Sequence, residues 1–158
     1  MAIPEQEIGE VKYYVLNYRY RQHKQVINYG DNLQSIAVRH LLEKFGVTDG
    51  EIGHIVRDDM GMKDHNRVPG IFIPATGGLS WNSYPDYRDI PINDHNLSIL
   101  YFGVRIPEGS FDVLRHCGRF IESLKKHEPI GCRDTCTRDF LRSLGIQSYF
   151  SKCVTLSF

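Results

Sequence analysis

The chain has 158 residues, a length that fits one domain able to bury an apolar core without disulfides or metal. Lysine and arginine together number 19, as do aspartate and glutamate, so the formal net charge is zero. A neutral chain has no long-range attraction for nucleic acid or for an anionic membrane, and we expect neither as a partner. The basic and aromatic stretch 18–24 (YRYRQHK) is a local exception, because it could contact a nucleic acid.

The chain contains four cysteines: Cys117, Cys132, Cys136 and Cys153. The first ten residues lack the basic and apolar regions of a secretory signal, so we expect a reduced, cytoplasmic protein. Cys132 and Cys136 could hold a metal, but no second Cys or His pair follows at finger spacing. We interpret all four as small core residues and expect no metal site. No apolar run reaches the roughly 20 residues that span a bilayer.

The N-terminal half shows strand and helix patterns in alternation. An aromatic and β-branched stretch predicts a strand at 13–18, and apolar residues at steps of three and four predict a helix over 32–45 that ends at Gly46. The expected inward face of this helix consists of Leu33, Ile36, Ala37, Leu41 and Phe45. Further strands are expected at 51–59 and 71–78.

The C-terminal half continues the alternation. The apolar run 97–106 is typical of a strand covered on both faces, and a helix is expected over 108–128. A short strand at 129–134 and a helix at 135–144 follow, and 147–158 is expected to form strand, turn and strand.

This alternation predicts a single α/β domain over 1–158, with a Rossmann-like, mostly parallel sheet and helices on both faces. In such folds ligands bind beyond the carboxyl ends of the strands, where loops enter helices. Glycine-bearing turns at 28–32, 77–78 and 131–134 fall at positions of this kind. We expect the three turns to converge on one rim and to form one side of a crevice.

The turn 28–32 (NYGDN) has two interpretations. Gly30 permits an unusual backbone angle or the close approach of a ligand. Asp31 or Asn32 can cap the following helix, and capping alone would explain the pattern. The alternative is a small polar pocket, in which Asp31 accepts a hydrogen bond from a hydroxyl or acts as general base, since its charge would repel an anion.

The other two turns are open to similar alternatives. Gly77 and Gly78 match neither a dinucleotide fingerprint nor a P-loop, and they mark either a simple turn or a ligand contact. Trp81 could stack on a sugar ring or pack under its own loop. Arg133 could bind a carboxylate or phosphate through two hydrogen bonds, or it could pair with Asp134, which is also well placed to cap the next helix.

Three segments, 28–42, 77–81 and 129–158, resemble the polysaccharide pyruvyl transferase family. The most specific part is the last segment, with Gly-x-Arg-Asp, a threonine three residues on, a Leu-Gly-Ile turn and the ending YFSKCVTLSF. The resemblance covers about the N-terminal half of a usual family member. It implies one half of a GT-B-like architecture, in which two Rossmann-like domains face each other across a cleft.

The resemblance also implies an activity, the transfer of an enolpyruvyl or pyruvyl group from phosphoenolpyruvate to a sugar hydroxyl of a cell-wall glycan or exopolysaccharide. It implies no cofactor, with phosphoenolpyruvate as donor substrate and a sugar or sugar-lipid as acceptor. By position, Asp31 is the expected base and Arg133 the expected contact to the donor. The expected substrate-binding residues are Asn28, Gly30, Asn32, Gly77, Gly78, Trp81 and Asp134.

One half cannot close a cleft, so we expect the chain alone to be inactive and to act with a C-terminal domain or another protein chain. Two other functions stay open. The same loops could serve a non-enzymatic module that holds a nucleotide, a sugar phosphate or a similar anionic metabolite. An exposed sheet edge or last strand could instead recruit a partner, including a second copy in a homo-oligomer.

Overall fold

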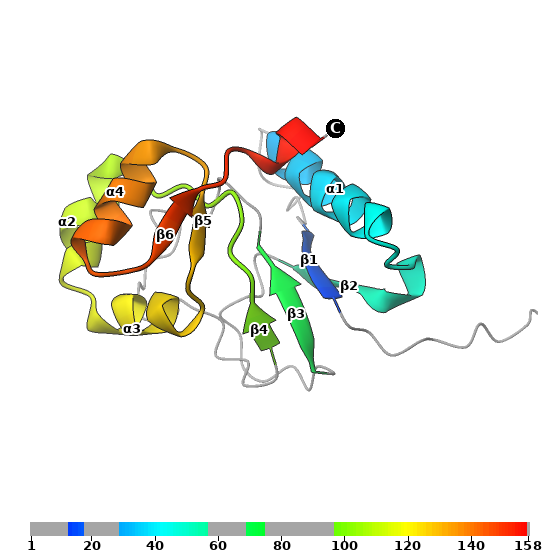
Figure 1. Cartoon of the computed structure of the whole chain (residues 1–158), viewed down its shortest axis with the longest axis horizontal. Coiled ribbons are helices and arrows are strands. Elements are labelled where there is room, and N and C mark those ends of the chain that lie inside the picture. Colours follow the sequence, from blue (N-terminus) through cyan, green and yellow to red (C-terminus); the bar gives the residue numbers. More distant parts are fainter. Residues whose placement is uncertain (1–12, 18–28, 57–68, 75–96, 158) are drawn as a thin grey trace, which may run out of the picture.

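The computed structural model describes residues 13–17, 29–56, 69–74 and 97–157, which contain two sheets (Figure 1). The first sheet has the strand order β2-β1-β3-β4 and the second pairs β5 with β6. The strands are β1 (Tyr13–Asn17), β2 (Ile52–Val56), β3 (Gly70–Ile73), β4 (Leu97–Ile99), β5 (Ile130–Cys132) and β6 (Ser148–Phe150). Every one of these strand pairs is parallel, which confirms the predicted parallel sheet.

The segment 101–104 connects the two sheets. Leu100 still donates its N–H to Phe72 of β3, but the Gly131 N–H of β5 donates to the Tyr101 carbonyl at 2.9 Å. Val104 then donates to the Gly131 carbonyl at 3.0 Å and forms a parallel bridge with Cys132. The continuation of β4 therefore lies beside β5, and the carboxyl ends of the strands face the same edge of the molecule.

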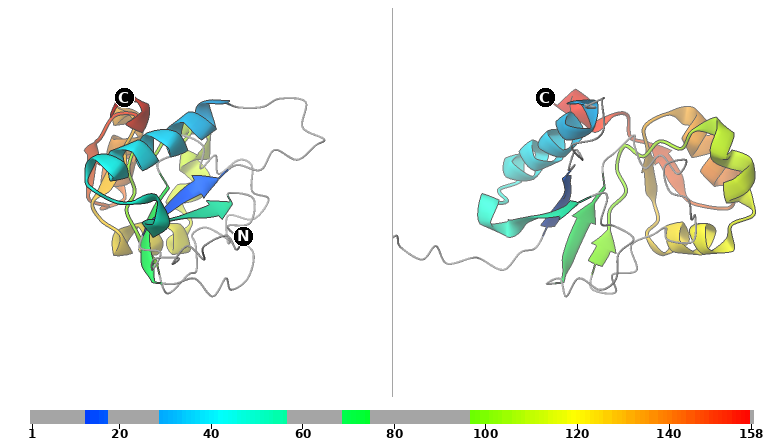
Figure 2. Two further views of the ribbon diagram at one scale, coloured as in Figure 1. Left: turned by 90° about the vertical axis from the view of Figure 1, so that its right-hand side faces the viewer. Right: turned by 180° about the vertical axis from the view of Figure 1, so that it is seen from behind.

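The helices lie between the strands in the chain and on two sides of the sheets in space (Figures 1 and 2). The α-helices are α1 (Tyr29–Lys44), α2 (Phe111–Arg115), α3 (Gly118–Lys126) and α4 (Thr135–Ser143). Short 3₁₀ turns are η1 (Asp49–Glu51), η5 (Glu108–Ser110) and η6 (Val154–Ser157). Helix α1 packs with η6 on one side of the four-stranded sheet, whereas α2, α3 and α4 gather around β5 and β6.

Both faces of β1 are buried. Val15 packs with Val38 of α1 and Val154 of η6, whereas Tyr14 and Leu16 belong to a second apolar cluster. Neighbouring strand residues point to opposite faces, so the two clusters lie on opposite sides of this strand. The second cluster continues into the apolar residues of α2, α3 and α4. Burial on both faces is typical of a parallel sheet in an α/β fold, and the molecule is compatible with the Rossmann-like class.

Helix α1 turns a partly different face to the sheet from the predicted one, although Ala37 is buried as expected. Leu33, Ile36 and Phe45 were expected inside but are 49%, 53% and 81% exposed. The buried positions are Gln34, Ala37, Val38 and Leu42. Apolar residues occupy two sides of this helix, and spacing alone does not say which side meets the sheet. The small Ala37 and the branched Val38 allow a close approach to β1, and that packing decides the face.

Three predicted elements of the C-terminal half differ from the structure. The strand expected at 97–106 ends at Ile99, after which the chain passes from β3 to β5, and Gly103 adopts a φ of 70° that strand residues avoid. The helix expected over 108–128 is divided into α2 and α3, and Gly118 begins the second of them. The last expected strand is replaced by η6, which follows Lys152 with its φ of 66°.

The outer edge of β6 is partly covered by a side chain. Residues 147 and 151 exchange hydrogen bonds with β5, so the carbonyl of Ser148 points away from it. Arg142 of α4 donates to this carbonyl through Nε at 3.1 Å and Nη2 at 2.9 Å. An occupied carbonyl is a poor partner for an added strand, so this feature weighs against edge pairing through β6.

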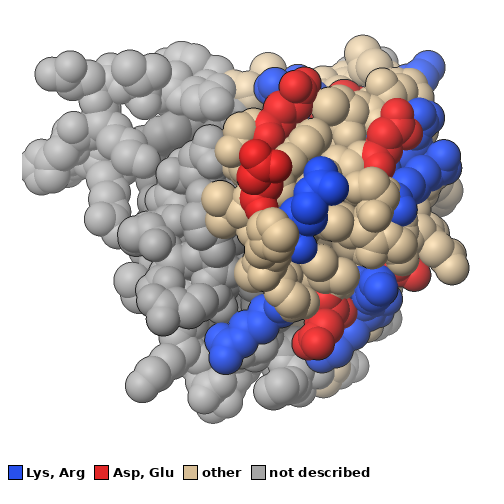
Figure 3. Space-filling view, turned by 90° about the vertical axis from the view of Figure 1, so that its left-hand side faces the viewer, with Lys and Arg blue, Asp and Glu red and all other residues tan. Residues whose placement is uncertain are grey.

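The face of the molecule shown in Figure 3 carries Lys and Arg side chains interspersed with Asp and Glu. The described residues on this face form no continuous basic surface for a phosphate backbone. Among the described residues, no helix is long and apolar enough to cross a membrane.

Gly131 stands where two chain segments meet. A Cβ atom at this position would lie 2.9 Å from the Tyr101 carbonyl oxygen and 2.9 Å from the Tyr149 hydroxyl. We predict that Gly131→Ala lowers the free energy of unfolding by about 1–3 kcal/mol, because one of these neighbours must move. Urea denaturation measures the change.

Gly118→Ala is the matched control, since a Cβ there meets nothing within 4 Å. It should leave stability unchanged or raise it by up to about 1 kcal/mol. Equal denaturation midpoints for Gly131→Ala and the wild type would show that the contact at β5 is looser than described.

His127 links α3 to β4. Its Nδ1 accepts a hydrogen bond from the Ile99 N–H at 3.3 Å, and its ring meets the Tyr101 ring edge-on at 6.2 Å between centroids. Burial, together with the nearby Lys126 charge, lowers the pKa of His127 below its usual 6.5. A protonated Nδ1 cannot accept this hydrogen bond, so the native state requires the neutral ring.

We therefore predict that the contribution of His127 to stability is intact above pH 6.5. It should decline as the pH falls below 6.5 towards the lower pKa of the folded state, since the unfolded chain binds the proton more readily. His127→Asn keeps an acceptor at the same position but does not titrate. Denaturation curves between pH 5 and pH 8 should show the wild type losing stability relative to this variant only on the acid side. A constant difference between the two proteins would contradict this role.

Candidate functional site

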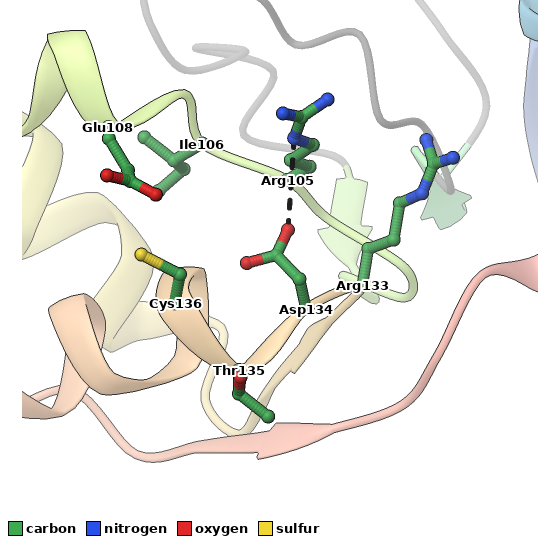
Figure 4. A pocket seen from close by; sticks show the side chains of 7 residues that line it. All are labelled: Arg105, Ile106, Glu108, Arg133, Asp134, Thr135 and Cys136. Carbon is green, nitrogen blue, oxygen red and sulfur yellow. Dashed lines mark ion pairs between the residues drawn. The ribbon is translucent and has the colours of Figure 1, made fainter.

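An open pocket of about 440 Å³ lies beyond the carboxyl end of β5 (Figure 4). Two chain segments form it, the stretch that follows Val104 and the turn from β5 into α4. The lining residues are Arg105, Ile106, Glu108, Arg133, Asp134, Thr135 and Cys136. Arg133 and Asp134, which the sequence singled out, therefore share one pocket.

Backbone and buried side-chain hydrogen bonds hold the two walls together. The Arg133 N–H donates to the Val104 carbonyl at 2.7 Å. Thr137, which is completely buried, accepts a hydrogen bond from the Ile106 N–H through its Oγ1 at 3.0 Å. Because the hydroxyl lies in the first turn of α4, it holds the stretch after Val104 against the helix that follows the Arg133–Asp134 turn. The relative position of the two walls of the pocket is therefore fixed by hydrogen bonds of the fold itself.

Asp134 caps α4, as the sequence predicted. Its backbone is extended, and its Oδ1 accepts the Thr137 N–H at 2.7 Å. The other oxygen, Oδ2, lies 3.9 Å from Nε of Arg105, with the two side chains 38% and 58% exposed. The expected alternative of a pair with Arg133 is wrong. The partner is Arg105. The pairing of Val104 with Cys132 places Arg105 next to the turn that carries Asp134.

Arg133 is half-buried, and its guanidinium points away from Asp134 (Figure 4). Within the part of the chain that the structure describes, no carboxylate lies within 4.0 Å of it. A guanidinium has five donors and favours carboxylate or phosphate groups, which it can bind through two parallel hydrogen bonds. Arg133 can therefore bind an anion that enters the pocket.

The cysteines near the pocket are thiols. Desolvation, together with a hydrogen bond to Glu108 and the charge of that residue, raises the pKa of Cys136. Burial first, and then the charge of Asp134, raises the pKa of Cys132 to about 12. A thiol with a raised pKa is a poor nucleophile and a poor metal ligand at neutral pH. The two thiols are therefore less reactive than an ordinary surface cysteine.

All four cysteines are free. Cys132 is buried as predicted and Cys117 and Cys153 are half-buried, but Cys136 is exposed, because the first turn of α4 directs it into the pocket. Among the described residues, no group of three or more His, Cys, Asp and Glu side chains could hold a metal ion.

The turn at the start of α1 lies at the same edge as the pocket (Figure 1). The helix begins at Tyr29, so Asp31 and Asn32 lie inside its first turn. The expectation that either residue caps this helix is wrong, since a cap residue stands before the helical turn. Gly30 is exposed and Asn32 half-buried; neither lines the pocket around Arg133.

The strand order separates the end of β1 from the Arg133 turn. Strands β3 and β4 lie between β1 and the edge of β5. Three strand intervals, about 14 Å, therefore lie between the carboxyl ends of β1 and β5. Asn28, Gly77, Gly78 and Trp81 lie outside the described residues, as does the side chain of Asp31.

Sequence reasoning missed Arg105 and Glu108. Both stand in or just after a run that was assigned to a buried strand. The signal that could have found Arg105 is a charged residue after Gly103 and before Pro107, since such a residue marks the point where a strand leaves the core.

Comparison of the chain with protein-family models, with curated proteins and with solved structures finds no significant match. No family is assigned on this basis. The resemblance to pyruvyl transferases stays a prediction, as does the pairing of this domain with a second one in a GT-B-like arrangement.

The cap at Asp134 gives a direct test of how the pocket turn is held. Asp134→Ala removes the acceptor for the Thr137 N–H and should lower the free energy of unfolding by about 1 kcal/mol. Asp134→Asn keeps an acceptor and should remain within a few tenths of a kcal/mol of the wild type. Thermal or urea unfolding of the pair measures the difference. A loss of the same size in both variants would assign the effect to the ion pair with Arg105.

Proposed function

We propose that this chain is the acceptor-side domain of a polysaccharide pyruvyl transferase, in which Arg133 binds phosphoenolpyruvate. The observation that carries the proposal is the Arg133 guanidinium, which lines an open pocket without a carboxylate partner among the described residues. It stands in the Gly-x-Arg-Asp turn, the most specific part of the resemblance. Parallel α/β sheets bind their ligands at this edge, which also supports the proposal.

The chemistry of the donor suits such a side chain. Phosphoenolpyruvate carries a phosphate and a carboxylate on the same carbon, and both are good acceptors for a guanidinium. When a sugar hydroxyl adds to that carbon, the hydroxyl loses its proton and the neighbouring methylene carbon gains one. The phosphate then leaves with its negative charge, either as the methyl group loses a proton again, which gives an enolpyruvyl ether, or as a second hydroxyl adds, which gives a ketal. A fixed cation beside the phosphate favours its departure, and a carboxylate base favours loss of the hydroxyl proton.

The positions of the two turns fit a reaction with two substrates. The α1 turn, which carries Asp31, and the Arg133 turn lie at the same edge of the molecule (Figure 1). A donor held at Arg133 and a sugar that extends toward α1 would lie along this edge. In the proposal, Asp31 serves the acceptor sugar and Arg133 the donor, while a facing domain completes the cleft.

A second candidate function is a non-enzymatic module that holds a sugar phosphate or a nucleotide. The observation that favours it is the presence of Glu108 and Asp134 in the same pocket as Arg133. Carboxylates accept hydrogen bonds from sugar hydroxyls, while the guanidinium binds the phosphate. A ligand that carries both kinds of group would use all three side chains without any reaction.

Titration calorimetry with phosphoenolpyruvate tests the first proposal. We predict that Arg133→Ala weakens binding about 10- to 100-fold, because it removes a charge-assisted hydrogen-bond pair from the ligand. Arg119→Ala is the matched control, since Arg119 is an exposed arginine on α3 outside the pocket, and it should bind as the wild type does.

A wild-type chain that binds glucose 1-phosphate or a nucleoside diphosphate, and not phosphoenolpyruvate, would favour the second candidate. Equal affinity of Arg133→Ala and the wild type for phosphoenolpyruvate would contradict the assigned role of Arg133.

A further inference from the structure

We infer that Arg105 is a second anion-binding residue of the pocket and that it makes the site selective for ligands with two separate anionic groups. The inference rests on the proposed binding of phosphoenolpyruvate at Arg133. It adds a residue that neither the sequence motifs nor the resemblance pointed to.

The backbone register places the two arginines side by side. Val104 and Cys132 form a parallel bridge, and the Arg133 N–H bonds to the Val104 carbonyl at 2.7 Å. The next pair in this register is Arg105 and Arg133, on backbones about 4.8 Å apart. Paired residues of neighbouring strands point to the same face, and both side chains extend to the same side of the pocket in Figure 4.

Arg105 keeps its terminal nitrogens available for a ligand. Its contact with Asp134 runs through Nε alone, at 3.9 Å, and the two terminal nitrogens point away from the carboxylate (Figure 4). The side chain is 58% exposed, so the pair is long and solvated, and such pairs are weak. An anion can therefore bind the outer side of this guanidinium while Asp134 stays in place.

Asp134 orients Arg105 from a fixed position. One of its oxygens accepts the Thr137 N–H at 2.7 Å, which leaves only the other oxygen to face Arg105. The carboxylate is thereby prevented from turning toward Arg133. Of the two neighbouring arginines, only Arg105 has a carboxylate within 4.0 Å among the described residues, and the repulsion between the two cations is relieved when an anion binds.

The geometry matches a ligand whose two acidic groups stand a few ångströms apart. Phosphoenolpyruvate is such a ligand, since its carboxylate and phosphate flank one carbon. One guanidinium can bind each group, whereas inorganic phosphate or pyruvate offers only one acidic group. Arg105 should therefore contribute to the affinity for phosphoenolpyruvate much more than to the affinity for either small probe.

The test compares Arg105→Ala, Arg105→Lys and Arg133→Ala with the wild type and with Arg119→Ala, using phosphoenolpyruvate, inorganic phosphate and pyruvate in calorimetry. We expect Arg105→Ala to weaken phosphoenolpyruvate binding at least about tenfold and phosphate binding by less than about threefold, with partial recovery in Arg105→Lys. The Nε–Hε signal of Arg105 in the wild type should shift on addition of phosphoenolpyruvate. Unchanged melting curves would show that the variants are folded.

The outcomes separate this inference from the proposed function. If Arg133→Ala loses affinity while Arg105→Ala binds phosphoenolpyruvate like the wild type, the role of Arg105 is overturned and the proposed function stands. If the wild type does not bind phosphoenolpyruvate, or if neither variant changes its binding, both are overturned. Equal losses of affinity for all three probes in Arg105→Ala would overturn the selectivity and leave Arg105 as a general cationic contact.

Discussion

The connection between the two sheets depends on the hydrogen bonds between segment 101–104 and β5. Through them the chain that leaves the four-stranded sheet becomes the neighbour of the two-stranded sheet. The same pairing sets Arg105 beside Arg133 and brings the Tyr101 carbonyl against Gly131, where a side chain has no room. Both the continuity of the core and the shape of the pocket follow from this one strand contact.

The buried hydroxyl of Thr137 gives the pocket its second constraint. It accepts a hydrogen bond from the Ile106 N–H, while the Thr137 N–H donates a hydrogen bond to Oδ1 of Asp134. One residue of α4 therefore holds both the loop that follows Arg105 and the turn that follows Arg133. A pocket fixed in this way can present charged side chains without reorganisation when a ligand binds, which lowers the cost of binding.

The chemistry within the pocket is electrostatic. The surroundings of Cys136 raise the pKa of its thiol, which makes it a weaker nucleophile, and charged side chains line the rest of the pocket. Two arginines and two carboxylates favour a ligand that combines anionic groups with hydroxyls. Phosphoenolpyruvate with a sugar acceptor and a single sugar phosphate both satisfy this condition, which is why binding measurements with each are needed to separate the two candidate functions.

The sequence by itself determined most of the alternation of strands and helices, the parallel pairing of the strands and the cap at Asp134, and it singled out Arg133, which lines the pocket. These features rest on local signals, namely hydrophobic periodicity, glycine at turns and a carboxylate before a helix. The tertiary structure alone decided the inward face of α1, because apolar residues on two of its sides compete and only packing against β1 selects between them. The tertiary structure alone also decided that Asp134 pairs with Arg105 and that Arg105 lies beside Arg133. The paired segments are 28 residues apart in the chain, and the local sequence pattern does not indicate which residues of two distant segments will pair.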